Sequence, residues 1–312
     1  MPISFSIAMI LNMVSAMLAM AFFTLLERKT LGYMQLRKGP NKVGIAGIPQ
    51  PFADVLKLLT KEQTSPSMSN IAPFVGAPIF ALILILMLWS LYPHKYNVLV
   101  IPFGIVLFLA VSSMNVYPTL GAGWTSNSKY ALLGSLRSVA QTISYEVSMT
   151  LILLAMLLIL QTYSFNTIIM SQMSWPLLMI PPLTVIWFIT NLAETNRAPF
   201  DFAEGESEIV SGFNVEYGSG GFALIFMAEY MSIIVMSLFT AVFLTPFIPS
   251  TLISPLWICG MTVFISILFI WARGSLPRMR YDRLMSLTWK MFLPFALGTL
   301  MAFMPMMFLM LS

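Results

Sequence analysis

Acidic side chains are concentrated in one segment of this chain. Half of its twelve carboxylates lie between positions 194 and 216, namely Glu194, Asp201, Glu204, Glu206, Glu208 and Glu216. Arg197 is the single basic residue among them, and Phe, Ile, Val and Tyr are interleaved with the acids. Carboxylates this close in a partly dry site cannot all ionise near neutral pH, so some of them should hold protons. The segment could therefore take up and release protons, although a solvated acidic loop is the simpler alternative.

Further ionisable residues lie inside long apolar stretches. A helix over 130–160 would carry two polar stripes on opposite faces, one of Arg137, Gln141, Ser144 and Ser148, and one of Thr142, Glu146 and Thr150. Glu229 would lie about two turns inside another helix. A charge at such depth costs at least ~2.5 kcal/mol to insert into a bilayer. Glu146 and Glu229 should therefore be buried in a helical bundle, as proton-transfer groups or, alternatively, in structural pairs.

The chain lacks the side chains that hold most cofactors. It has one Cys and one His, neither with neighbours that could complete an iron-sulfur cluster, a structural zinc site or a haem ligand pair. We therefore expect no metal site here, and any redox cofactor should belong to a partner protein. The lone thiol, Cys259, lies in an apolar stretch and is expected to be buried and inert.

The composition predicts that these residues are carried by membrane helices. The composition is 58% hydrophobic and 9% charged, against about a quarter charged in soluble domains. Charged residues are absent from 1–26, 96–128, 147–193 and 230–272, and each of these runs exceeds the roughly 20 residues needed to cross a bilayer. We expect an all-α polytopic protein, one membrane domain over residues 1–312, with eight spans near 2–26, 70–92, 98–120, 130–160, 176–193, 221–248, 251–272 and 289–311.

Basic residues predict the orientation of these spans. The loops 27–69, 121–129, 194–220 and 273–290 would share one side, and they hold Arg28, Lys29, Arg37, Lys38, Lys42, Lys57, Lys61, Lys129, Arg197, Arg273, Arg278, Arg280, Arg283 and Lys290. The opposite side would have Lys95 alone. The positive-inside rule then places the long loops in the matrix or cytoplasm and both termini outside. Topology thus accounts for the net charge of +4, and no nucleic-acid partner is needed.

The first inner loop contains an amphipathic segment, 50–62. Pro51 suits a first helical turn. A helix here would have one apolar face, formed by Phe52, Val55, Leu56 and Leu59. Its charged face would be formed by Asp54, Lys57 and Lys61. We expect a short helix lying in the membrane interface.

Long strings in two loops resemble a known family. Residues 26–44 read LERKTLGYMQLRKGPNKVG and are followed by QPFAD at 50–54, while 193–217 contain AETNRAPFD and EGESE. These strings, and the loop 278–285, resemble the quinone-site membrane subunits of respiratory NADH-quinone oxidoreductase, complex I. The resemblance covers the whole chain, and its Met-rich composition is more like a mitochondrially encoded member than a bacterial one.

The resemblance implies a place and a role for this chain. It implies a multi-pass subunit of the mitochondrial inner membrane, with its long loops toward the matrix and both termini toward the intermembrane space. Such a subunit frames a chamber for the headgroup of ubiquinone, the substrate, and binds no redox cofactor itself. The iron-sulfur clusters and FMN are expected in peripheral-arm partner subunits, and small and antiporter-like membrane subunits are further partners.

The same resemblance implies roles for individual residues. The polar mouth of the quinone chamber is expected at Arg28, Gln35, Arg37, Asp54, Lys57, Arg197 and Arg273. Quinone reduction takes up two electrons and two protons, and the acidic segment would pass the resulting charge change into the membrane. The proton-coupling set is expected to be Glu146, Glu194, Asp201, Glu204, Glu206, Glu208, Glu216 and Glu229.

Two other functions fit part of the pattern. A secondary transporter could use membrane carboxylates to couple protons to a solute, but the long basic and acidic loops do not recur in both halves, as an inverted repeat would require. The membrane subunit of a hydrogenase complex would share helices and acids without binding quinone. The long loop strings favour the quinone-reducing family.

Overall fold

The described part of the chain is helical throughout. The computed structural model describes residues 2–93, 101–171, 180–203, 205, 212–244 and 253–311, and these residues contain no strand. Within them, seven helices are long and apolar enough to cross a membrane. The fold is thus that of an α-helical polytopic membrane protein.

The helices follow the predicted spans with some shifts in their ends. They are α1 (Pro2–Met34), α2 (Gln50–Thr60), α3 (Ile71–Trp89), α4 (Gly104–Met114), α5 (Val116–Thr125), α6 (Lys129–Leu160), α7 (Phe165–Ser171), α9 (Pro181–Glu194), η1 (Gly212–Glu216), α11 (Ser219–Leu244), α12 (Ile253–Ser275), α13 (Tyr281–Leu287), the π-helical turn η2 (Thr288–Phe292) and α14 (Leu293–Leu311). The third predicted span, 98–120, corresponds to α4 and α5, which meet at Asn115. The fifth, 176–193, is described from Pro181 as the 14-residue α9. The predicted turn at 245–251 between the sixth and seventh spans lies outside the described residues.

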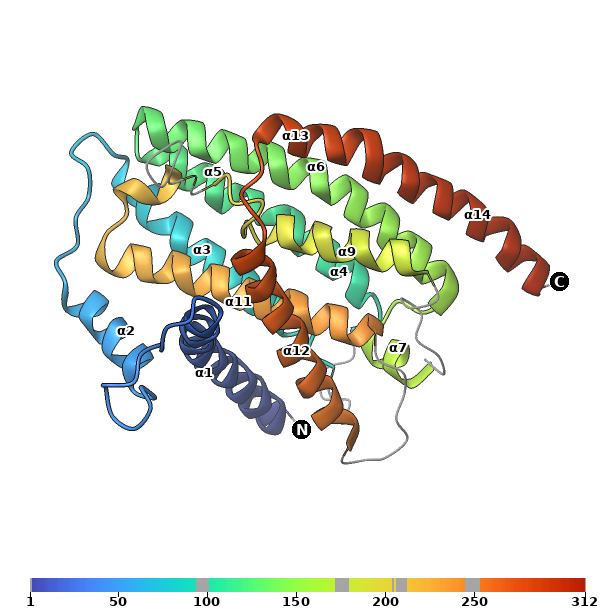
Figure 1. The fold of residues 1–312 in the computed structure, drawn as a ribbon, viewed down its shortest axis with the longest axis horizontal. Helices are drawn as coiled ribbons and strands as arrows, with labels where there is room; N and C mark the ends of the chain where they lie inside the picture. The colour runs from blue at the N-terminus through green and yellow to red at the C-terminus, as the bar shows by residue number, and fades with distance from the viewer. Residues whose placement is uncertain are drawn as a thin grey trace.

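Two helices organise the bundle. Helix α11 contacts α1, α2, α3, α7 and α12, while α6 contacts α5, α9, α14 and η1. Figure 1 shows α11 crossing the middle of the molecule and α14 extending along one edge to the C-terminus. Aromatic rings fill the core beside α11: Phe239 packs against Phe108 and Phe165 with ring centroids 4.7 Å apart in both pairs. Contacts of this kind hold membrane helices together, because lipid removes the hydrophobic drive to associate.

Small residues bring the backbone of α6 close to its neighbours. A Cβ atom added to Gly134 of α6 would lie 2.8 Å from the Cα of Gly212 in η1. One added to Gly123 of α5 would lie 2.2 Å from the hydroxyl oxygen of Ser135 on α6. These approaches fix α5 and the end of the acidic segment against α6.

The polar stripes predicted on α6 are largely internal. Gln141, Ser144 and Ser148 are buried, and Glu146 is half-buried on the other side of the helix. The expectation of a buried Cys259 is wrong, because α12 turns this face away from the bundle and the thiol is exposed. Its sulfur lies 3.7 Å from the hydroxyl oxygen of Tyr92.

Candidate functional site

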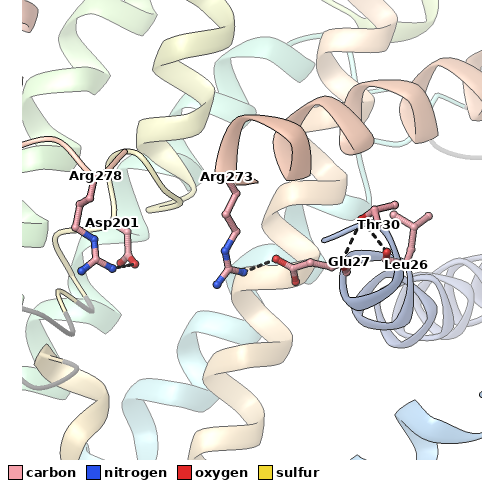
Figure 2. Close-up of polar contacts among 6 residues, drawn as sticks. All are labelled: Leu26, Glu27, Thr30, Asp201, Arg273 and Arg278. Atoms are coloured by element: carbon pink, nitrogen blue, oxygen red, sulfur yellow. Dashed lines mark hydrogen bonds and ion pairs between the residues drawn. The ribbon is translucent and has the colours of Figure 1, made fainter. Parts of the chain in front are cut away.

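Three charged side chains and a tyrosine, from four segments, meet at one end of the bundle. Arg273, near the end of α12, forms an ion pair with Glu27 of α1, and Figure 2 shows the two side chains pointing toward each other. Tyr230 of α11 shares a hydrogen bond with Glu27, and the guanidinium carbon of Arg197 lies 4.4 Å from the centre of the Tyr230 ring. We call Glu27, Arg197, Tyr230 and Arg273 the inner charge cluster. Glu27 is only 5% exposed, so its charge depends on these partners.

The end of α9 places Arg197 in this cluster. Asn196 adopts a left-handed conformation, with φ of 49°. The backbone N–H of Asn196 then donates to the Ala193 carbonyl at 3.2 Å, and that of Arg197 to the Leu192 carbonyl at 3.3 Å. This is the hydrogen-bond pattern of a Schellman helix end. The chain therefore reverses sharply after Glu194 and presents Arg197 to α11.

The first inner loop holds the other predicted chamber residues in separate contacts. Arg28 forms a 2.6 Å ion pair with Asp54 of α2, which also accepts a 2.9 Å hydrogen bond from Gln50. Arg37 donates to the side-chain oxygen of Gln35 at 3.0 Å. Lys57 is exposed on α2. Among the seven predicted chamber residues, Arg197 and Arg273 thus share the inner charge cluster, whereas the others lie at the end of α1, in α2 and in the segment between them.

Two predicted proton-coupling carboxylates line one cavity. Glu194, at the end of α9, and Glu229 of α11 face a cavity of about 50 Å³ between α3, α5, α9 and α11. Its polar lining also includes Asn115, Thr119, Thr195, Asn196 and Ser232. This volume holds several water molecules, and the polar lining gives them hydrogen-bond partners. Glu146 of α6 is close enough to interact electrostatically with Glu194. The fold therefore brings three carboxylates that are distant in sequence into one region.

Of the remaining predicted carboxylates, the structure describes Asp201 and Glu216. Asp201 forms a 2.8 Å ion pair with Arg278, as Figure 2 shows. The backbone N–H of Met279 donates to the Pro199 carbonyl at 3.1 Å, so the loop before α13 holds this side of the acidic segment. Glu216 is half-buried in η1. Glu204, Glu206 and Glu208 lie outside the described residues.

Sequence reasoning missed Glu27, Tyr230 and Arg278. The sequence did contain an indication for Glu27, because Glu27 directly follows the charge-free run 1–26 and Arg273 directly follows the run 230–272. Both residues therefore lie at the inner boundary of a span, at similar depth, which makes them natural partners. Tyr230 offered no such signal, since a tyrosine in an apolar helix is ordinary.

The described ranges contain no group of three or more His, Cys, Asp or Glu side chains that could hold a metal ion.

Comparison with known proteins agrees with the resemblance of the loops. The model of the NADH dehydrogenase family matches residues 7–304. The chain is 53% identical to NADH-ubiquinone oxidoreductase chain 1 of Aedes aegypti over 298 residues, which is 95% of this chain and 94% of that protein. It is 50% identical to the protein of the same name from Sapajus apella over 306 residues, covering 97% and 96% of the two chains. The chain therefore belongs to the NADH dehydrogenase family.

Proposed function

We propose that this chain is the membrane subunit of proton-pumping NADH-ubiquinone oxidoreductase that frames the quinone chamber and couples quinone reduction to proton translocation. One observation carries this proposal: Glu194 and Glu229 line a common cavity with room for several water molecules, and Glu146 is close enough to interact with Glu194. A row of carboxylates with room for water between them is what proton transfer through a membrane requires. The names of the relatives supply the substrate, ubiquinone, and the assembly.

The inner charge cluster forms one polar wall of the quinone chamber in this proposal. Arg197 and Arg273 provide positive charge where the quinone oxygens gain negative charge on reduction, and the Tyr230 hydroxyl is a hydrogen-bond donor beside them. Glu27 offsets part of the positive charge when the chamber is empty. The pocket that Glu27, Arg197 and Arg273 line within this chain has only about 10 Å³, so the other chamber walls belong to partner subunits. FMN and iron-sulfur clusters in those subunits supply the electrons.

The acidic segment connects this wall to the cavity. Arg197 and Asp201 lie on the chamber side of the turn that follows α9, and Glu194 lies at its other end. A change in charge at the chamber therefore alters the electrostatic potential at Asp201 and Glu194 over a short distance. Protons then move between Glu194 and Glu229 through cavity water, with Glu146 as a third site. Glu204, Glu206, Glu208 and Glu216 are further members of the proton-coupling set in this proposal.

The membrane placement completes the proposal. In this proposal α9 belongs to the fifth of eight spans, so the loops carrying the site face the matrix of the mitochondrion and both termini face the intermembrane space. Helix α2 lies in the membrane interface. Its side chains Phe52, Leu56 and Leu59 are 44%, 62% and 63% exposed, which suits contact with lipid acyl chains.

The assembled complex offers the direct test. Glu194→Gln and Glu229→Gln keep side-chain volume but cannot carry a negative charge, so we expect both to lower the number of protons moved per electron to less than half. The exposed Glu62→Gln is the matched control and should leave this ratio unchanged. NADH oxidation, quinone reduction and acidification would be measured together in sealed vesicles. Normal proton transport in both cavity variants would contradict the proposal.

A further inference from the structure

A buried amide on α6 holds the turn that follows α9. Gln141 is fully buried, and its side-chain nitrogen donates to the Ala193 carbonyl at 3.0 Å and to the Phe200 carbonyl at 2.8 Å. These two carbonyls bracket the turn that begins with Glu194. Gln141 precedes Glu146 by little more than one turn of the same helix. One side chain thus links the helix that carries Glu146 to the segment that carries Glu194.

The chemistry of this link suits a primary amide. Its NH₂ group has two hydrogens, one for each carbonyl, whereas a serine or threonine hydroxyl has one. The opposite orientation of the amide would place its oxygen against two carbonyl oxygens, which repel it, so the direction of the group is determined by its partners. Buried hydrogen bonds of this kind fix position, because breaking them leaves carbonyls without compensation from water.

The turn is also held from its other side. The Met279 N–H bonds the Pro199 carbonyl, and Arg278 pairs with Asp201. Tyr145 packs against Phe200, with ring centroids 5.7 Å apart. Loss of the Gln141 contacts should therefore shift the Glu194 side of the turn without releasing the whole segment.

We propose that Gln141 is a positioning residue for proton transfer, which sets the separation of Glu194 from Glu146 and its direction toward the cavity. This inference rests on the proposed function, since it assigns Gln141 a role in the same proton path. Gln141 touches neither the cavity lining nor the inner charge cluster through any of these hydrogen bonds. Its effect is thus exerted through the turn.

Gln141→Met in the assembled complex tests the proposal, because methionine matches the length of glutamine but donates no hydrogen bond. The matched control is Ser148→Ala, which removes another buried polar group from the same stripe of α6. The Ser148 hydroxyl donates to the Tyr145 carbonyl of its own helix, and to no other group among the described residues. We expect Gln141→Met to lower kcat about tenfold and to leave KM for ubiquinone within about threefold, as a displaced catalytic group does. Amide hydrogen exchange at 195–203 should become faster.

Gln141→Glu covers the case in which Gln141→Met does not assemble. Its carboxyl donates one hydrogen bond when protonated and none when ionised, so kcat relative to the unmodified complex should fall about tenfold as the pH rises from about 6 to about 9. A pH profile parallel to that of the unmodified complex would overturn the assignment.

The outcomes separate this proposal from the one on which it rests. If Glu194→Gln and Glu229→Gln both transport protons normally, the proposed function itself fails. If Glu194→Gln loses proton transport while Gln141→Met behaves like Ser148→Ala, only the role of Gln141 is refuted. Slow turnover of Gln141→Met, together with faster amide hydrogen exchange at 195–203, supports both the proposed function and the role of Gln141.

Discussion

The ion pair between Arg273 and Glu27 allows a quantitative prediction. Arg273→Met would leave the Glu27 carboxylate, 5% exposed, with the Tyr230 hydrogen bond but without its ion pair. Removing one partner from a fully buried pair costs about 3–5 kcal/mol. The Arg273 side chain is 41% exposed, so solvent screening reduces the expected cost to about 1–3 kcal/mol.

This cost should appear in kcat/KM for ubiquinone. The uncompensated carboxylate would repel the negative charge that develops on the quinone, so we expect kcat/KM of Arg273→Met to fall about 5- to 150-fold. Adding Glu27→Gln removes that carboxylate charge. The double variant should therefore be more active than Arg273→Met alone, with a coupling energy of about 1–3 kcal/mol in a double-mutant cycle.

A second ion pair in the same chain serves as the control. Arg280 and Asp282 are 3.1 Å apart, but their side chains are 80% and 72% exposed. Their coupling energy should be below about 0.5 kcal/mol. For the exposed pair, the free-energy effects of the two single substitutions are expected to add. If the effects of Arg273→Met and Glu27→Gln on kcat/KM add in the same way, the assignment of a buried, interdependent cluster is refuted.

Three further predictions concern the scaffold around the site. Gly134→Ala should reduce the amount of assembled complex on native gels. The added Cβ would lie 2.8 Å from the Gly212 Cα and 3.1 Å from the Phe213 nitrogen, both of them backbone atoms. Overpacking of this kind costs about 1–3 kcal/mol of stability. Gly298→Ala, with no atom within 4 Å of the added Cβ, should assemble normally. Ser219→Ala should destabilise the junction of α2 and α11 by about 1 kcal/mol, because the Ser219 hydroxyl donates to backbone carbonyls of that junction. Its oxygen lies 2.8 Å from the Lys61 carbonyl oxygen and 3.2 Å from that of Leu58. Faster amide exchange in residues 58–64 would verify this prediction, and unchanged exchange would contradict it. Arg278→Gln should accelerate proteolysis near residues 199–203 by breaking the 2.8 Å pair with Asp201, whereas an unaltered cleavage rate would show that the pair does not hold this segment.

Local patterns in the sequence predicted the helices because each pattern acts through neighbouring residues. Charge-free runs longer than a bilayer coincide with helices that are long and apolar enough to cross a membrane. A helix, α2, begins at Gln50, and its position in the membrane interface stays a prediction. The acidic segment was recognised because its carboxylates are close in sequence. Glu146 and Glu229 were recognised because a charge in an apolar helix is costly wherever that helix lies.

Tertiary packing decided which of these groups meet. Glu194 and Glu229 line one cavity because α3 packs against both α5 and α11, and α9 meets α11 through the Trp187 and Phe243 rings; no spacing along the chain encodes that arrangement. The partner of Arg273 is Glu27, which lies 246 positions away, and Gln141 reaches the carbonyls of Ala193 and Phe200 from another helix. Cys259 is exposed because the orientation of α12 in the bundle, and not its own apolar sequence, sets which face turns outward. Sequence thus determined which segments become membrane helices and where charge is costly, whereas close packing of those helices selected the partners that compensate each charge.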